Sequence, residues 1–263
     1  CGIFAALALV PVSATRKDQP RPPKSFPSAP WKLIQAAPAA AISVFVAGLI
    51  NTGVLTFIPI WAETLGEDSA VADAGFGAAA LMMGAIYIAS MAVQWPAGRL
   101  SDQIDRRMVI AGLGATFGGI ALILTLLVDP GLIGGLILIG LWGAAAMSHY
   151  GIAVAHAADR ADSDQLPAMT SCLLMLWGGG SIIGPLVAGG LYASPFGMRG
   201  VFLFAALGGA ALTGLMFLRQ RERTAPDPVD RDAFVNLQAT SAALSETPEP
   251  DFEPSWEPDD QAL

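Results

Sequence analysis

The sequence predicts an all-α membrane protein, a bundle of six transmembrane helices followed by a disordered acidic tail. Three observations support this fold class. Hydrophobic residues make up 54% of the 263 residues and charged residues only 14%, whereas soluble domains are about 25% charged. The mean hydropathy is +0.55. Six long stretches contain no charged residue, and a helix needs about 20 apolar residues to cross a bilayer.

The uncharged stretches give the positions of the predicted spans. They cover residues 33–62, 74–98, 108–128, 130–158, 165–198 and 200–218. Their length favours helices over a membrane β-barrel, whose strands alternate apolar and polar residues over about 10 positions. Glycines inside the stretches, such as Gly180 and Gly184, favour close helix packing in lipid. We therefore expect residues 33–218 to form a six-helix transmembrane domain in contact with the lipid bilayer.

Three segments flank this domain. Residues 1–12 are apolar and short, as expected for the end of a preceding transmembrane helix, so we expect the chain to be a fragment of a longer protein. Residues 13–32 are basic and rich in proline, which indicates a linker. Residues 219–263 hold 11 acidic and 4 basic side chains, in a composition typical of disorder.

The connections between the spans divide the basic residues unevenly. When alternate connections are summed, 13 of the 14 Lys and Arg residues fall on one side of the membrane, and only Arg199 falls on the other. Basic residues accumulate on the cytoplasmic side of membrane proteins. We therefore expect a multi-pass protein of the bacterial inner (plasma) membrane, with both the linker and the acidic tail in the cytoplasm.

Charge and cysteine content exclude several other functions. The net charge of −8 argues against a nucleic-acid partner, since such proteins are basic. Two cysteines, Cys1 and Cys172, are too few for a zinc site or a disulfide framework. We expect no metal and no cofactor.

The connection between the second and third spans has the sequence GRLSDQIDRR, residues 98–107. We expect it to form a short charged loop. A carboxylate at a helix end can accept hydrogen bonds from the N-terminus of a helix, and arginines favour the anionic leaflet. The loop resembles motif A of the major facilitator superfamily, with matches at Gly98, Asp102, Arg106 and Arg107 and with Asp105 in place of a second glycine. Together with His156–Arg160, it resembles the YcaD-like branch of that superfamily.

The resemblance implies the fold and the function in more detail. The chain resembles the C-terminal half, helices 7–12, of a twelve-helix transporter built as a 3+3 inverted repeat. It implies a secondary transporter that works by alternating access, with a six-helix N-terminal half as partner. It also implies that the motif residues gate the cytoplasmic side: Gly98, Asp102, Asp105, Arg106 and Arg107.

The few polar and aromatic residues within the spans are candidates for the pathway of a small solute, and of H⁺ if transport is proton-coupled. They are Asn51, Thr52, Tyr87, Gln94, Trp142, His149 and Trp177. Trp142 and His149 are seven positions apart and so share one stripe of a helix. An ionisable group at membrane depth is a functional candidate, which favours His149. We expect His156, near the end of its span, to be a hydrated loop residue.

Two other functions remain open at this stage. Six helices with Ser and His also fit an intramembrane hydrolase, but the expected Gly-x-Ser-Gly is missing, because Ile182 follows Ser181. We therefore do not expect an enzyme. A truncated membrane protein that transports nothing is the other alternative.

Overall fold

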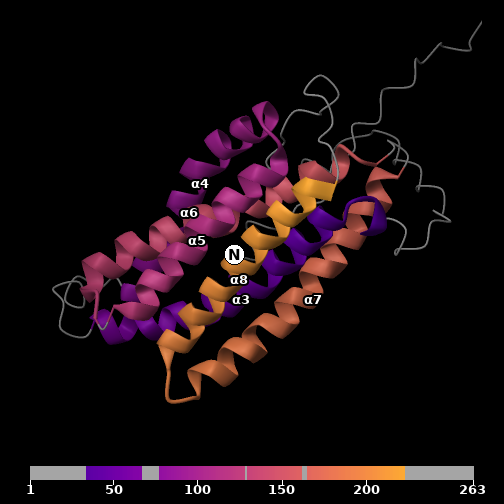
Figure 1. Ribbon diagram of the computed structural model, residues 1–263. Helices are drawn as coiled ribbons and strands as arrows, with labels where there is room; N and C mark the ends of the chain where they lie inside the picture. Colours follow the sequence, from indigo (N-terminus) through magenta and orange to yellow (C-terminus); the bar gives the residue numbers. More distant parts are fainter. Residues whose placement is uncertain (1–33, 67–76, 128, 162–164, 223–263) are drawn as a thin grey trace, which may run out of the picture.

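The computed structural model describes residues 34–66, 77–127, 129–161 and 165–222. Six long helices account for nearly all of these residues, and no strand occurs among them: α3 (Pro38–Gly66), α4 (Ala78–Gln103), α5 (Arg106–Leu126), α6 (Gly131–Ala158), α7 (Leu166–Tyr192) and α8 (Met198–Glu222) (Figure 1). The predicted end of a preceding helix (1–12), the linker (13–32) and the tail beyond Glu222 lie outside the described residues.

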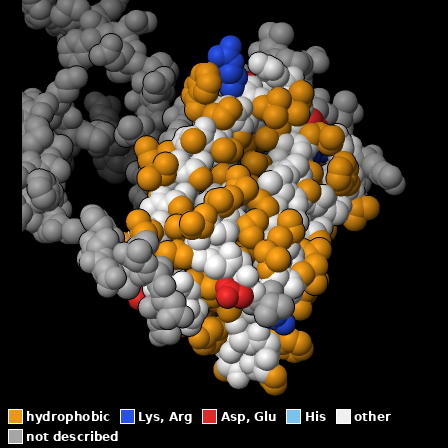
Figure 2. All heavy atoms as spheres, turned by 90° about the vertical axis from the view of Figure 1, so that its left-hand side faces the viewer, with side chains coloured by type: hydrophobic (Ala, Val, Ile, Leu, Met, Phe, Trp, Pro, Cys, Tyr) orange, Lys and Arg blue, Asp and Glu red, His pale blue; other side chains and the backbone are white. Residues whose placement is uncertain are grey.

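All six helices are long and apolar enough to cross a membrane, which confirms the predicted bundle of six transmembrane helices. A helix satisfies its own backbone groups, so it is the structure that an isolated apolar segment adopts in lipid. The chain is therefore a multi-pass membrane protein. On the face of the bundle shown in Figure 2, hydrophobic side chains are spread over most of the surface and few charged side chains lie among them.

The loop predicted for residues 98–107 is wrong in its extent. Helix α4 continues to Gln103 and α5 begins at Arg106, so only Ile104 and Asp105 join them. Charged residues do not interrupt a helix once it has left the hydrocarbon, and hence the helices run past the ends of the uncharged stretches. Most of the motif is therefore helical.

Two tight turns that contain glycine and proline join helices of the bundle. At the start of α6, the Asp129 carboxylate accepts a hydrogen bond of 2.8 Å from the main-chain N–H of Gly131. Gly131 has a φ of +62° and Gly197, before α8, has a φ of +53°. Both values lie in the left-handed region, which glycine adopts without a steric penalty.

The helices pair in a pattern that repeats after three helices. The most extensive pairs are α3 with α7, α5 with α8, and α4 with α6. Exchanging α3 with α6, α4 with α7 and α5 with α8 leaves this set of pairs the same. The pair α3–α7 becomes α6–α4, the pair α4–α6 becomes α7–α3, and the pair α5–α8 remains itself. Because successive helices are antiparallel, the exchanged triplets have opposite orientations. This is the pairing expected of a 3+3 inverted repeat.

Helices α3 and α6 form the centre of the bundle, and α4 and α7 are its most exposed members. In Figure 1, α3, α7 and α8 lie side by side. Glycines allow the close contact between α3 and α7. A Cβ atom added to Gly184 would lie 2.1 Å from the carbonyl oxygen of Leu49, and one added to Gly180 would lie 2.3 Å from that of Phe45.

Candidate functional site

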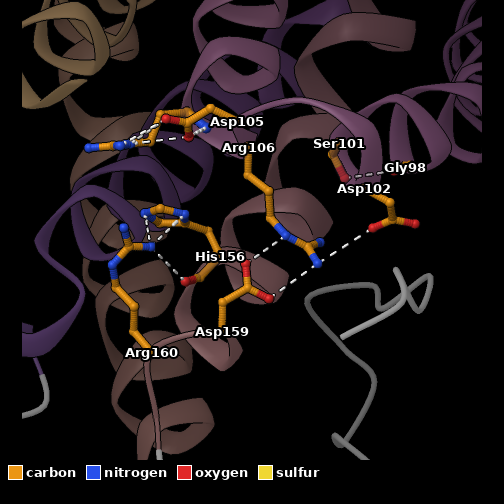
Figure 3. A network of polar contacts seen from close by, with 9 residues as sticks. Gly98, Ser101, Asp102, Asp105, Arg106, His156, Asp159 and Arg160 are labelled. Carbon is orange, nitrogen blue, oxygen red and sulfur yellow. Dashed lines mark hydrogen bonds and ion pairs between the residues drawn. The ribbon is translucent and has the colours of Figure 1, made fainter. Parts of the chain in front are cut away.

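A cluster of charged side chains joins one end of α4, α5 and α6 (Figure 3). We refer to it as the charged cluster. Its members come from the end of α4, the start of α5 and the end of α6: Asp102, Asp105, Arg106, Arg107, His156, Asp159 and Arg160. Four of them belong to the motif, and the other three follow about fifty residues later.

Arg106 lies at the centre of the charged cluster and is only 2% exposed. Its Nε donates to Asp159 Oδ2 at 2.8 Å, and its Nη2 donates to Asp159 Oδ1 at 3.2 Å. This two-bond geometry is the one that fixes an arginine most firmly to a carboxylate. Nη2 also lies 3.4 Å from Asp102 Oδ1. One guanidinium therefore ties α5 to both α4 and α6.

Arg107 connects the same end of α5 to α8. Its Nε and Nη2 donate to the Asp105 carboxylate, the latter at 2.8 Å. Its Nη1 donates to the main-chain carbonyl of Arg219 at 2.8 Å. Carbonyls in the last turn of a helix lack partners within the helix, so this bond also stabilises the end of α8.

Asp105 is the residue that accepts a hydrogen bond from a helix N-terminus. It is the N-cap of α5, and its Oδ1 accepts from the main-chain N–H of Arg107 at 2.9 Å. Burial by itself would raise the pKa of the Asp105 carboxyl, but the hydrogen bonds and the positive charge of Arg107 outweigh it and hold this pKa below its ordinary value. Asp105 is therefore a carboxylate at neutral pH.

The prediction that His156 is a hydrated loop residue is wrong. It lies in the last turn of α6 and is only 3% exposed. The Arg160 guanidinium folds back over its ring, with Nη1 3.0 Å from Nδ1 and 2.9 Å from Nε2. A nitrogen that receives this donor must be unprotonated, since both nitrogens of an imidazolium are donors.

Gly98, the first residue of the motif, is buried within α4. Its carbonyl accepts a hydrogen bond of 2.7 Å from the hydroxyl of Ser101, which is fully buried. Sequence reasoning missed Asp159 and Arg160 as site residues. The available signal was a group of charges directly after a span, at the same end of the bundle as the motif.

The candidate pathway residues lie in three separate places. Tyr87 and Gln94 lie on α4, the most exposed helix. Tyr87 is 49% exposed, and the Gln94 amide donates to the Ser90 hydroxyl within the helix. Thr52 and Trp177 lie where α3 meets α7, since the Thr52 hydroxyl approaches the carbonyl of Ser181 at 3.4 Å and Trp177 packs against the core.

Asn51 and His149 lie where α3 meets α6, and Trp142 is a buried residue of α6. The Asn51 amide donates to the carbonyl of Ala146 at 2.9 Å. Trp142 and His149 are fully buried, and the His149 ring stacks on Phe117 of α5 with its centroid 5.5 Å away. The two residues share one stripe, as their spacing predicts, and this stripe faces the interior of the half bundle.

Comparisons with known proteins agree with this architecture. The family model of the Major Facilitator Superfamily matches residues 1–162 and 78–250. Curated relatives include proteins described as "Uncharacterized MFS-type transporter YcaD" in Salmonella paratyphi B (strain ATCC BAA-1250 / SPB7) and Salmonella newport (strain SL254). Each is 28% identical to this chain over 186 residues.

The aligned region covers 70% of this chain but only 44% of each relative. The chain thus spans less than half the length of the curated relatives it matches. No solved structure matches the chain. The family match extends over most of the sequence, and the six helices and their pairing fit it. The chain belongs to the major facilitator superfamily, a family of membrane transporters.

Proposed function

We propose that this chain forms the six-helix C-terminal half of a secondary transporter, which moves a small solute by alternating access in the bacterial inner membrane. The observation that best supports this proposal is the charged cluster. At one end of the bundle it joins α4, α5 and α6 through pairs of side chains, and it joins α8 through the Arg107 side chain and a main-chain carbonyl. Such contacts can break and re-form while the helices move as rigid bodies, as alternating access requires.

The charged cluster is proposed to lie on the cytoplasmic side and to stabilise the state that is closed there. The distribution of Lys and Arg supports this orientation. Asp102 is the member best placed to exchange partners. Its side chain is 33% exposed and 3.4 Å from Arg106, whereas that of Asp159 is 2% exposed and 2.8 Å away.

The solute is proposed to bind on the surface that α3, α4, α6 and α7 present to a six-helix N-terminal partner. Tyr87 and Gln94 are the predicted pathway residues nearest to such a surface, because α4 is the most exposed helix. Few charged side chains occur within the spans, which favours an uncharged or weakly charged solute. H⁺ is the proposed coupling ion.

A flux measurement in liposomes tests this function. The chain, expressed together with whatever coding sequence precedes it in its gene, is reconstituted into liposomes and offered radiolabelled small solutes in a counterflow assay. A transporter accumulates its labelled solute when the unlabelled solute is inside. We expect Asp102→Asn to reduce this flux and Asp129→Asn, an exposed carboxylate at the other end of the bundle, to leave it unchanged. Equal flux in both variants would contradict the gating role.

A further inference from the structure

Four buried side chains with polar atoms come from α3 and α6, apart from the charged cluster. Ser43 and Asn51 come from α3, and Trp142 and His149 come from α6; none is more than 7% exposed. Among the described residues, five of their polar atoms have no hydrogen-bond partner. These are the Ser43 hydroxyl, the Asn51 amide oxygen, the Trp142 indole nitrogen and both ring nitrogens of His149. Buried polar groups are almost always paired, with protein or with water.

The surroundings of His149 supply only one kind of partner. The main-chain carbonyls of Ser43, Ala145 and Ala146 face its ring, and Phe117 stacks on the ring with an interplanar angle of 26°. A neutral imidazole has one N–H donor and one nitrogen lone pair. A carbonyl can accept from the N–H, but it has no proton to offer to the lone pair. The described groups that face the ring therefore satisfy neither neutral tautomer completely.

A bound water can supply the missing donor. A buried water normally makes two to four hydrogen bonds to otherwise unsatisfied polar groups. Here it could donate to the lone pair of His149 and to a carbonyl oxygen while it accepts from the Ser43 hydroxyl. Hydroxyl, imidazole and carbonyls thus match the requirements of a bound water better than those of an apolar or anionic ligand.

We propose that Ser43 and His149 bind internal water between α3, α5 and α6, and that His149 exchanges its ring proton through this water. In each exchange, one ring nitrogen gives its proton to a water oxygen, and a water O–H gives a proton to the other nitrogen. The ring changes tautomer and the charge is conserved. The proposed water site deepens the proposed function. The binding of water does not depend on transport; only the consequence that H⁺ is the ion bound by this half rests on the proposed function.

The site lies at a defined depth along the bundle. Asn51 and Ala146, which are hydrogen-bonded, lie near the middle of their helices. His149 is about one turn from Ala146 toward the end of α6 that holds the charged cluster, and His156 lies about 10 Å further along the helix axis. The water site thus lies between the middle of the bundle and the charged cluster.

Histidine spectroscopy tests the proposal directly, because the chain contains only two histidines. The 263-residue chain, labelled with ¹⁵N-histidine, is incorporated into lipid nanodiscs, and His149→Gln identifies the signal of His149. We expect a cross-peak between water protons and the His149 ring nitrogens. We also expect its ring proton to exchange with deuterium much faster than the main-chain amides of α6 around it.

Variants at Ser43 then distinguish exchange through bound water from exchange through local opening of the helices. Ser43→Val removes the hydroxyl at similar volume and should slow the exchange by about two- to tenfold, as the loss of one hydrogen bond implies. Ser43→Thr should retain the exchange rate. Ser148→Ala is the matched control, since the Ser148 hydroxyl donates to Ala144 within α6.

A missing water cross-peak, together with a ring proton as protected as the surrounding amides, would overturn the proposal. So would a Ser43→Val protein that exchanges at the unaltered rate. A thermal unfolding transition of each variant shows that it is folded, and Ser43→Ala replaces any variant that is not. None of these measurements uses a transported solute, so this site and the transport function can fail independently.

Discussion

The Asn51 side-chain amide donates a hydrogen bond of 2.9 Å to the main-chain carbonyl of Ala146, and it does so near the middle of both α3 and α6. Each of these helices opens one of the two triplets of the inverted repeat. The bond therefore joins the two repeats at their most buried contact. An asparagine at this depth is costly in lipid and favourable only where a second helix supplies a partner.

We expect Asn51→Ala to lower the free energy of unfolding by about 0.6 kcal/mol, the average for hydrogen bonds between membrane helices, and by no more than about 1.7 kcal/mol, their maximum. Thermal unfolding of the chain in a mild detergent measures this loss. Thr116→Val is the control. The Thr116 side chain is exposed, and its hydroxyl donates to Gly112 within α5, so this change should have little effect. A similar loss in both variants would contradict the role of Asn51 in joining the repeats.

The close contact between α3 and α7 should make the chain sensitive to a larger residue at Gly184. A Cβ atom at position 184 would lie 2.1 Å from the carbonyl oxygen of Leu49. Main-chain atoms cannot move aside as a flexible side chain does. We expect Gly184→Ala to force the helices apart at a cost of about 1–3 kcal/mol, as overpacking does in other cores. Denaturant unfolding in detergent measures this cost.

Gly179→Ala is the matched control for this change. It lies on the same helix, and an added Cβ would meet nothing within 4 Å. Alanine is the better helix former, so this variant should be as stable as the original chain or slightly more so. If Gly179→Ala destabilised the chain as much as Gly184→Ala, close contact between α3 and α7 would not be the cause.

The sequence predicts the spans well because each span is a single uninterrupted segment, and its apolar character does not depend on any other part of the chain. The charged cluster is predicted only in part. Asp102 and Arg106 belong to one motif, but the closest partner of Arg106 is Asp159, 53 positions later. No local sequence pattern predicts that Asp159 is this partner.

The surroundings of the two histidines are also set by residues distant in the sequence or by side-chain conformation, which the sequence pattern does not predict. The seven-residue spacing correctly places Trp142 and His149 on one stripe of α6. Whether this stripe faces the interior or a pathway depends on Phe117 and Ser43, which come from other helices. The burial of His156 depends on Arg160, whose side chain folds back over the ring. A charged residue one turn away predicts solvation as readily as burial.

The two carboxylates of Arg106 should differ in their contribution to stability. Removing one partner of a buried ion pair typically costs about 3–5 kcal/mol. We expect Asp159→Asn to approach this loss, because Asp159 is almost fully buried and makes two hydrogen bonds. Asp102→Asn should cost clearly less, since Asp102 is partly exposed and 3.4 Å away. Unfolding of both variants in one detergent gives the comparison, and the reverse order would contradict the central place of Asp159.

The proposed orientation predicts the accessibility of single cysteines. With Cys1 and Cys172 replaced by serine, a cysteine is placed at Gln103 or at Ala193. Both positions are exposed and lie at opposite ends of the bundle. A membrane-impermeant maleimide added to intact cells should label position 193 and not position 103. Permeabilised cells should show labelling at both positions, which controls for reactivity. Labelling of position 103 in intact cells would reverse the topology.

The low pKa of the Asp105 carboxyl predicts how stability changes with pH. The hydrogen bonds and charge of Arg107 outweigh the effect of burial and hold this pKa below 3.8, its ordinary value in an unfolded chain. The unfolded state therefore takes up a proton before the folded state does. The stabilisation by Asp105 is fully present above the unfolded-state pKa and is lost as the pH falls through the folded-state pKa.

We expect Asp105→Asn to unfold more easily than the original chain near neutral pH, and the difference should shrink as the pH falls below 3.8. Denaturant unfolding from neutral to strongly acidic pH, with Asp129→Asn as the exposed control, measures both quantities. A difference that stayed constant over this range would show that Asp105 acts through its shape and its N-cap hydrogen bond and not through its charge.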